Sequence, residues 1–319
     1  MKTQKVAIGS NLYIEAIGFS MYTFLTGKIV KRDLYKGGAE RSLGEYMEHL
    51  VRGKLAEMAF KKFLLQEFGT QSLLDIDLPI FIKGKYLPDI LAFKSDNGDW
   101  VLPRFWIEVK AVVEGQKWAL IRVSSLRGGR RAKPRPYDAY VNVRVHLPKD
   151  HVGRLIRYSP RIAERVSREW VERLTDLEEI DVEILGFALH SDMVCILNAS
   201  VDEEAKKQLN SFFGAGWAFV RKGSKLHDPE TGKETVELGA DNCAVAVSKL
   251  RAGLEWESLL NLLDENKPLA RERSPQAQST LEREMKKAMY ALSKQKPISW
   301  FHRTLDSGQL TLRNILRKR

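Results

Sequence analysis

The sequence has few cysteines and no long apolar segment. No uninterrupted apolar run approaches the roughly 18 residues that a membrane-spanning helix requires, and the start of the chain lacks the regions of a secretory signal. Cys195 and Cys243 lie in apolar runs without a His or Cys at ligand spacing, so we expect free, buried thiols rather than disulfides or a zinc site. These absences predict a soluble, cytoplasmic protein with no membrane partner.

Low-complexity tracts and internal repeats are also missing. With 319 residues, 44% apolar and 29% charged, the composition is that of an ordinary globular protein of one or two domains. We expect an irregular N-terminal layer at residues 1–40 and a compact core at residues 41–150. An additional α+β region with a helical, basic C-terminus is expected at residues 151–319.

Hydrophobic patterning predicts a helix followed by a β-meander in the first half of the chain. Apolar positions recur at helical spacing over residues 42–68, with Gly69 as a C-terminal stop and a kink allowed near Gly53. Strands are predicted at residues 75–82, 86–93 and 100–111, the last two joined by an Asn97-Gly98 hairpin.

The remainder of the chain mixes strand and helix patterns. The fold class that follows is α/β, with a central mixed β-sheet flanked by helices and an additional, partly helical C-terminal region. The predicted strands are 117–123, 137–147, 182–189, 193–197 and 242–250. The predicted helices are 160–177, 203–212 and further segments after residues 254, 279 and 305.

Charged residues interrupt two apolar strands that the hairpin brings side by side. Pro88-Asp89 enters the first strand, and Glu108-Val109-Lys110 lies on the second. Residues two apart on a strand point to the same face, so Glu108 and Lys110 emerge together. Hard carboxylate oxygens suit Mg²⁺, and a neighbouring cation suits phosphodiester hydrolysis, where it orients water or stabilises the transition state.

These motifs resemble those of the PD-(D/E)XK nuclease superfamily, which includes many restriction endonucleases and archaeal-type Holliday junction resolvases. The resemblance covers roughly residues 44–147 and implies a restriction-endonuclease-like core. It implies that Asp89 and Glu108 bind Mg²⁺, for which Mn²⁺ substitutes, and that Lys110 acts on the water or the transition state. The helical segment Gly53-Lys-Leu-Ala-Glu57 matches a further acidic position of the family, so Glu57 is implied as an auxiliary metal ligand or water-binding group. Glu45 or Glu48 would substitute if the helix kinks.

The net charge of +11 and the pI near 9.5 favour a polyanionic partner. Net charge alone also fits a merely soluble basic protein, so its distribution matters. Between Gly115 and Tyr137 there is no acidic residue, and we expect a flexible loop beside the Glu108 strand that contacts phosphates or guanine. A solvated charged loop is the alternative. The candidate nucleic-acid-binding residues are Lys117, Arg122, Arg127, Arg130, Arg131, Lys133 and Arg135.

Together these features predict a Mg²⁺-dependent endodeoxyribonuclease that cuts double-stranded DNA, most simply a type II restriction-type endonuclease acting as a homodimer. One alternative is a structure-specific repair or junction nuclease. Another is a nucleic-acid-binding protein with the same fold that does not cleave. The basic segment at residues 264–319 is a candidate second DNA-contacting or dimerising element, with intramolecular packing as the alternative.

Overall fold

The structure is a computed structural model that describes most of the chain. No helix within the described part is long and apolar enough to cross a membrane. The described residues are 3–25, 35–36, 39–40, 43–82, 87–127, 137–148, 151–152, 179–199, 202–228, 231–232, 234–266 and 275–294.

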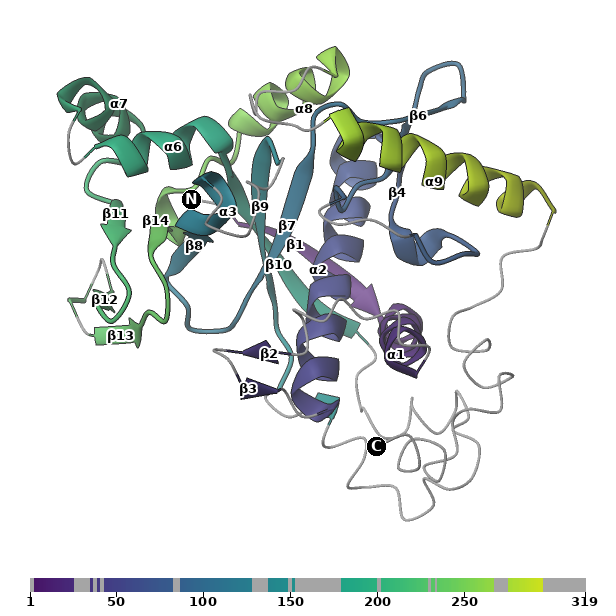
Figure 1. The fold of residues 1–319 in the computed structure, drawn as a ribbon, viewed down its shortest axis with the longest axis horizontal. Coiled ribbons are helices and arrows are strands. Elements are labelled where there is room, and N and C mark those ends of the chain that lie inside the picture. Colours follow the sequence, from purple (N-terminus) through teal and green to yellow (C-terminus); the bar gives the residue numbers. More distant parts are fainter. Residues whose placement is uncertain are drawn as a thin grey trace.

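A four-stranded mixed sheet forms the centre of the molecule (Figure 1), as the sequence predicts. The edge strand β7 (Ile107–Val112) pairs in parallel with β9 (Ala139–Val145), and the remaining pairs are antiparallel. The order across the sheet is β1 (Gln4–Gly9), β10 (Glu179–Leu189), β9 (Ala139–Val145) and β7 (Ile107–Val112).

The expectation of an irregular N-terminal layer was wrong. Residues 4–9 form β1, which pairs with β10 along its whole length, and α1 (Ser10–Leu25) follows directly. Val6 and Ile8 are the two buried positions of β1. An alternation of two apolar residues is too short to be recognised as a strand in the sequence. Because β10 comes from the predicted C-terminal region, the boundaries near residues 40 and 150 cut across a single sheet.

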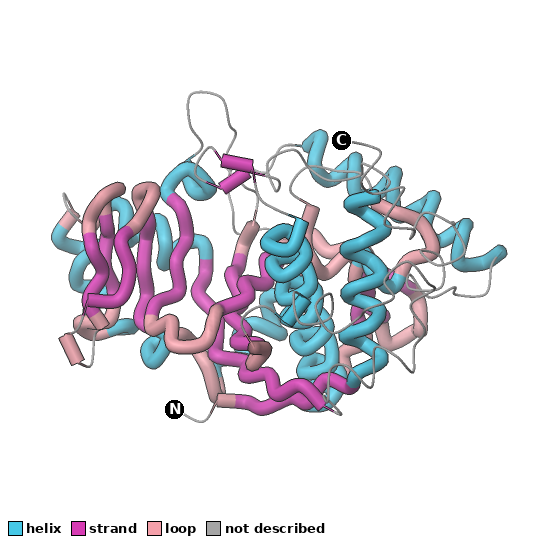
Figure 2. The backbone as a smooth tube through the Cα atoms, turned by 90° about the horizontal axis from the view of Figure 1, so that it is seen from below, coloured by secondary structure: helices cyan, strands magenta, loops and turns pink. Residues whose placement is uncertain are grey.

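Both faces of the main sheet are covered. Ile107 and Val109 face a core formed with α1, α2 (Leu43–Phe68) and α8 (Glu255–Glu265). Trp106 and Val112 face a second core, to which α6 (His190–Asn198) and α9 (Pro275–Lys294) contribute. Figure 1 shows α2 running across one face of the sheet with α1 beside it, and Figure 2 gives the same layers from below.

A smaller sheet continues from the main one, because β8 follows β7 after a short turn. Its antiparallel strands are β11 (Trp217–Val220), β14 (Asn242–Ala246) and β8 (Trp118–Arg122). Both cysteines are free, as expected, but only Cys243 is buried and Cys195 is half-buried. The neighbouring elements are α3 (Val123–Arg127), α7 (Glu203–Phe213), β12 (Lys225–His227), β13 (Glu234–Glu237) and η3 (Val247–Lys249).

Several short strands predicted from apolar runs are wrong. Residues 75–82 contain the 3-10 turn η2 (Asp75–Asp77) instead, because the Asp77 carboxylate accepts a hydrogen bond from Leu74 N at 2.8 Å and closes the turn. Residues 193–197 lie within helix α6, whose first turn is closed by Asp192 accepting from Leu189 N. Short apolar runs do not separate strand from helix.

The predicted hairpin is present but shorter than expected. Its strands are β5 (Ala92–Lys94) and β6 (Trp100–Val101), and Gly98 occupies the turn with a φ of 83°. The predicted helices at 160–177 and after residue 305 lie outside the described residues. The remaining short strands are β2 (Tyr35–Lys36), β3 (Ala39–Glu40), β4 (Ser72–Leu73), β5 (Ala92–Lys94) and β6 (Trp100–Val101).

Helix α2 runs continuously through Gly53 and ends at Phe68, before Gly69 with a φ of 69°. The kink that the sequence allowed is replaced by regular helix. A Cβ atom added at Gly53 would meet nothing within 4 Å. Gly53 is therefore not required by packing within the described structure.

We predict that Gly53→Ala stabilises the protein by about 0.5–1 kcal/mol, because alanine loses less backbone entropy inside a helix. The free energy of unfolding in urea measures this change. The control is Gly69→Ala, which forces a left-handed conformation on alanine and should destabilise by about 1–2 kcal/mol. A loss of stability in Gly53→Ala would contradict a strain-free helix at this position.

Candidate active site

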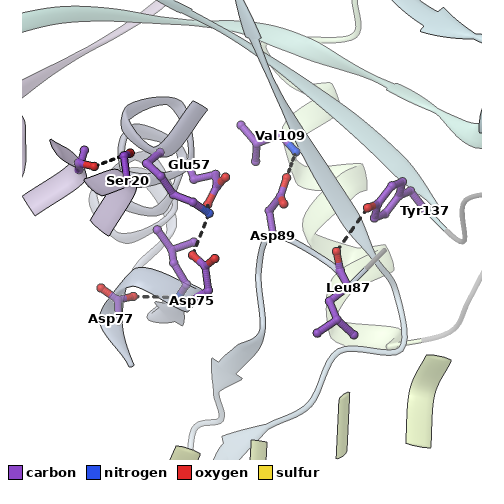
Figure 3. A network of polar contacts seen from close by, with 11 residues as sticks. Ser20, Glu57, Asp75, Asp77, Leu87, Asp89, Val109 and Tyr137 are labelled. Atoms are coloured by element: carbon purple, nitrogen blue, oxygen red, sulfur yellow. Dashed lines mark hydrogen bonds and ion pairs between the residues drawn. The ribbon is translucent and has the colours of Figure 1, made fainter. Parts of the chain in front are cut away.

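Asp89 lies along the outer edge of β7, where no regular strand is assigned. Its backbone N–H donates to the carbonyl of Ile107 at 3.1 Å. Its Oδ2 atom accepts a hydrogen bond from Val109 N at 2.6 Å, an interaction drawn in Figure 3. The side chain thus supplies the acceptor that a neighbouring backbone would otherwise provide, and it is held against the Glu108 strand as the sequence predicts.

Further hydrogen bonds fix the segment that carries Asp89. The Leu91 N–H donates to the carbonyl of Leu73 at 2.8 Å. The Tyr137 hydroxyl donates to the carbonyl of Leu87 at 3.4 Å, at the other end of the segment (Figure 3). Contacts on both sides of Asp89 therefore set the position of its carboxylate.

Glu108 and Lys110 point to the same face of β7, as predicted, and their side chains form an ion pair. Ile107 and Val109 pack toward α2, so the alternation of a strand directs Glu108 and Lys110 to the other face. Glu108 is buried, whereas the Lys110 side chain is 31% exposed. The Glu108–Lys110 pair is therefore in contact with solvent at the Lys110 ammonium, whereas its carboxylate is buried.

Glu57 lies on the other side of Asp89, in an ion-pair cluster on α2. The Lys54 ammonium donates to Glu57 Oε2 at 2.7 Å and to Asp75 Oδ1 at 2.8 Å. Lys54 and Glu57 are both 7% exposed. Figure 3 shows Glu57 and Asp75 converging on one ammonium group, with Asp89 on the strand side of the cluster.

The two groups of charges meet electrostatically at Asp89. The pKa of Asp89 is raised to about 7, chiefly by burial and also by the neighbouring Glu108 charge. Lys54 and Lys110 act in the opposite direction. Burial also raises the pKa of Glu57 well above its usual range, and the charges of Asp89 and Asp75 add to that effect, against Lys54. Both carboxylates are therefore harder to ionise than exposed ones, and a nearby positive charge favours their ionised form.

The donor chemistry fits a magnesium ion. Within the residues that the structure describes, no three His, Cys, Asp or Glu side chains converge closely enough to hold a metal. Mg²⁺ is commonly bound through one or two carboxylates, with waters and substrate phosphates completing its octahedron. Asp89 and Glu108 are adjacent carboxylates with a solvent-facing neighbour in Lys110, and they provide such a partial ligand set.

The expected set of site residues is largely brought together, with two additions that sequence analysis missed. Lys54 lies three residues before Glu57, the spacing of helical ion pairs, which was a usable signal. Asp75 fell in a wrongly predicted strand, and nothing local placed it beside α2. Glu45 is exposed at the start of the helix, so the unkinked α2 gives it no part in the cluster.

The predicted basic loop is partly regular structure. Arg122 ends β8 and is exposed, and Arg127 ends α3, where it donates to Asn198 Oδ1 at 2.7 Å. Lys117 directly precedes β8 and is half-buried. The flexible-loop expectation is therefore wrong for residues 117–127. The other four candidates lie outside the described residues: Arg130, Arg131, Lys133 and Arg135.

The basic C-terminal segment is described only as far as α9. Leu281 and Met285 of this helix are buried in the second core, which supports intramolecular packing for that face. Tyr290 remains 68% exposed. Residues 295–319 lie outside the described part of the chain.

Comparison with known proteins returns no relative: no protein-family model, no curated protein and no solved structure matches the chain.

We predict that Asp89→Asn stabilises the protein increasingly between about pH 4 and about pH 7. The pKa of Asp89 is about 7 in the folded protein against an ordinary 3.8, so the unfolded chain loses this proton first and folding is penalised as the pH rises. The asparagine oxygen still accepts from Val109 but carries no charge. Urea denaturation of both proteins across this range measures the difference, which should level off above the folded-state pKa. Parallel stability profiles would contradict the prediction.

Proposed function

We propose that this chain is a Mg²⁺-dependent endodeoxyribonuclease of the PD-(D/E)XK type, with the main sheet as a restriction-endonuclease-like core. The observation that carries the proposal is the position of Asp89 on the edge of β7. Its carboxylate accepts from Val109 N, the residue between Glu108 and Lys110. Three side chains suited to phosphodiester hydrolysis thereby meet at one place.

Each residue has a distinct part in the proposed reaction. Asp89 and Glu108 hold the metal, which supplies Lewis-acid activation of the phosphodiester when bound. Lys110 pairs with Glu108 and reaches solvent, so its ammonium can orient the attacking water and stabilise negative charge on the phosphate. Glu57 is paired with Lys54, and we assign it to holding that lysine rather than to the first set of metal ligands.

A restriction-type enzyme remains the favoured version of this proposal. The smaller sheet and its helices lie outside the proposed core and offer room for a target-recognition element. Cutting both strands of DNA favours a homodimer. A structure-specific repair or junction nuclease is the alternative enzyme, and mapping the ends of cut phage DNA, methylated and unmethylated, separates the two.

We predict that Asp89→Asn and Lys110→Met each reduce nicking of plasmid DNA in Mg²⁺ by about 100-fold or more, because each removes charge that acts on the transition state. Binding of the same DNA, measured without divalent metal, should persist. Supercoiled-plasmid assays at matched protein concentration provide the measurement.

Matched controls come from the nearby hairpin. Asp96→Asn and Lys94→Met change the same side chains at exposed positions and should leave nicking unchanged. Wild-type protein that nicks neither plasmid, phage nor branched DNA in Mg²⁺ or Mn²⁺ would sink the enzymatic proposal. Retained DNA binding in that case would favour the non-cleaving alternative.

We predict that Arg122→Ala weakens DNA binding by a similar factor on all sequences and lowers the slope of log affinity against log salt by about one. The reason is that an exposed guanidinium at the end of β8 would contact a phosphate rather than a base. Fluorescence anisotropy at several salt concentrations measures both quantities. Lys206→Ala on α7, another exposed cation that pairs with Glu203, is the control. An unchanged salt slope in Arg122→Ala would remove β8 from the interface.

A further inference from the structure

Lys54 is an unusually enclosed lysine. Its ammonium lies 2.7 Å from Glu57 Oε2 and 2.8 Å from Asp75 Oδ1, and it sits over the Phe19 ring at 5.2 Å from the ring centroid. The side chain is 9% exposed. Burial of a lone ammonium is costly, so this position persists because carboxylates and an aromatic face replace the water.

The charge on Lys54 is firmly retained. Burial lowers its pKa, but the charges of Asp75 and Glu57, with a smaller contribution from Asp89, outweigh burial and raise the pKa above the ordinary range for lysine. Asp89 thus lies within the field of two cations, Lys54 on the helix side and Lys110 on the strand side.

The ring of Phe19 distinguishes the Lys54 position from a metal position. An ammonium gains from an aromatic face, whereas Mg²⁺ demands oxygen ligands in near-octahedral geometry. Phe19 is 2% exposed and stacks on Phe81, so it cannot readily withdraw. The surroundings on this side of Asp89 therefore suit a lysine ammonium better than a metal ion.

Charge balance leads to the same conclusion. Four carboxyl groups contribute to the cluster, those of Glu57, Asp75, Asp89 and Glu108, and metal binding favours their ionised forms. When all four are ionised, the ammoniums of Lys54 and Lys110 neutralise two of them. One divalent cation neutralises the remainder. A second divalent ion would place two further positive charges beside a buried ammonium, at the separation of roughly 4 Å that two-metal sites adopt.

We propose that the Lys54 ammonium takes the place of a second divalent cation, so that the site holds one metal ion, bound by Asp89 and Glu108. The proposal rests on the proposed nuclease function and deepens it. Lys54 is then a positioning residue. Its ammonium pairs with Glu57 and Asp75 and so keeps these carboxylates from binding the metal, and its charge favours the ionised form of Asp89.

Manganese binding to the full chain, measured without DNA, tests the proposal. Titration followed by the EPR signal of free Mn²⁺ should give one ion per wild-type chain. Lys54→Met removes the ammonium while keeping much of the side-chain volume, so it frees Glu57 and Asp75 and should bind two ions per chain. At low temperature, two ions roughly 4 Å apart should also show spin coupling that the wild type lacks.

The matched control is Lys61→Met, at a position on the same helix as Lys54. This change breaks the ion pair between Lys61 and Asp77, and the variant should still bind one ion. Lys54→Arg keeps the positive charge and should likewise bind one. Two ions in the wild type, or one in folded Lys54→Met, would overturn the proposal while leaving the nuclease function standing. No bound ion in the wild type would overturn the metal site itself. If Lys54→Met fails to fold, the counts for wild type and Lys54→Arg decide.

Discussion

The hydrogen bond from Val109 N to the Asp89 carboxylate is the interaction on which the candidate site depends. β7 is one of the two edge strands of the main sheet, so its outward N–H groups need acceptors that no regular strand among the described residues supplies. Asp89 provides one through its side chain, and this brings an ionisable group to a sheet edge. The side chains of β7 alternate between the two faces of the sheet, so Glu108 and Lys110 lie on one face and α2 covers the other.

The arrangement trades stability for concentrated charge. Buried carboxylates that repel one another are costly, and their pKa values rise because the protonated form relieves that cost. Such clusters of shifted groups are typical of functional sites, although structural ion-pair networks produce them as well. Within this chain the lysines reduce the cost without removing it, which leaves the carboxylates able to gain from a further cation.

The parts of the fold that the sequence predicted are those set by local pattern. Alternation placed Glu108 and Lys110 on one face, and helical spacing placed Glu57 on α2. Asp75 was missed because its turn is closed in part by a hydrogen bond that the Asp77 carboxylate accepts from Leu74 N. Asp89 was assigned to a strand that is irregular in the structure. The position of β1 was unpredictable for another reason: its partner β10 is far away in the sequence, and no short-range pattern encodes that pairing.

The position of β10 late in the sequence also limits when the main sheet can form during synthesis. Every residue of the candidate site precedes β9 in the chain. Within the described strands, however, β10 is one of the two neighbours of β9 and the sole neighbour of β1. During synthesis on the ribosome, β1 must therefore wait until the chain has extended past residue 184 before it can pair along its whole length. Loop closure over such a distance is slow. A ribosome-bound fragment that already contains every candidate catalytic residue thus lacks half of the sheet that supports them.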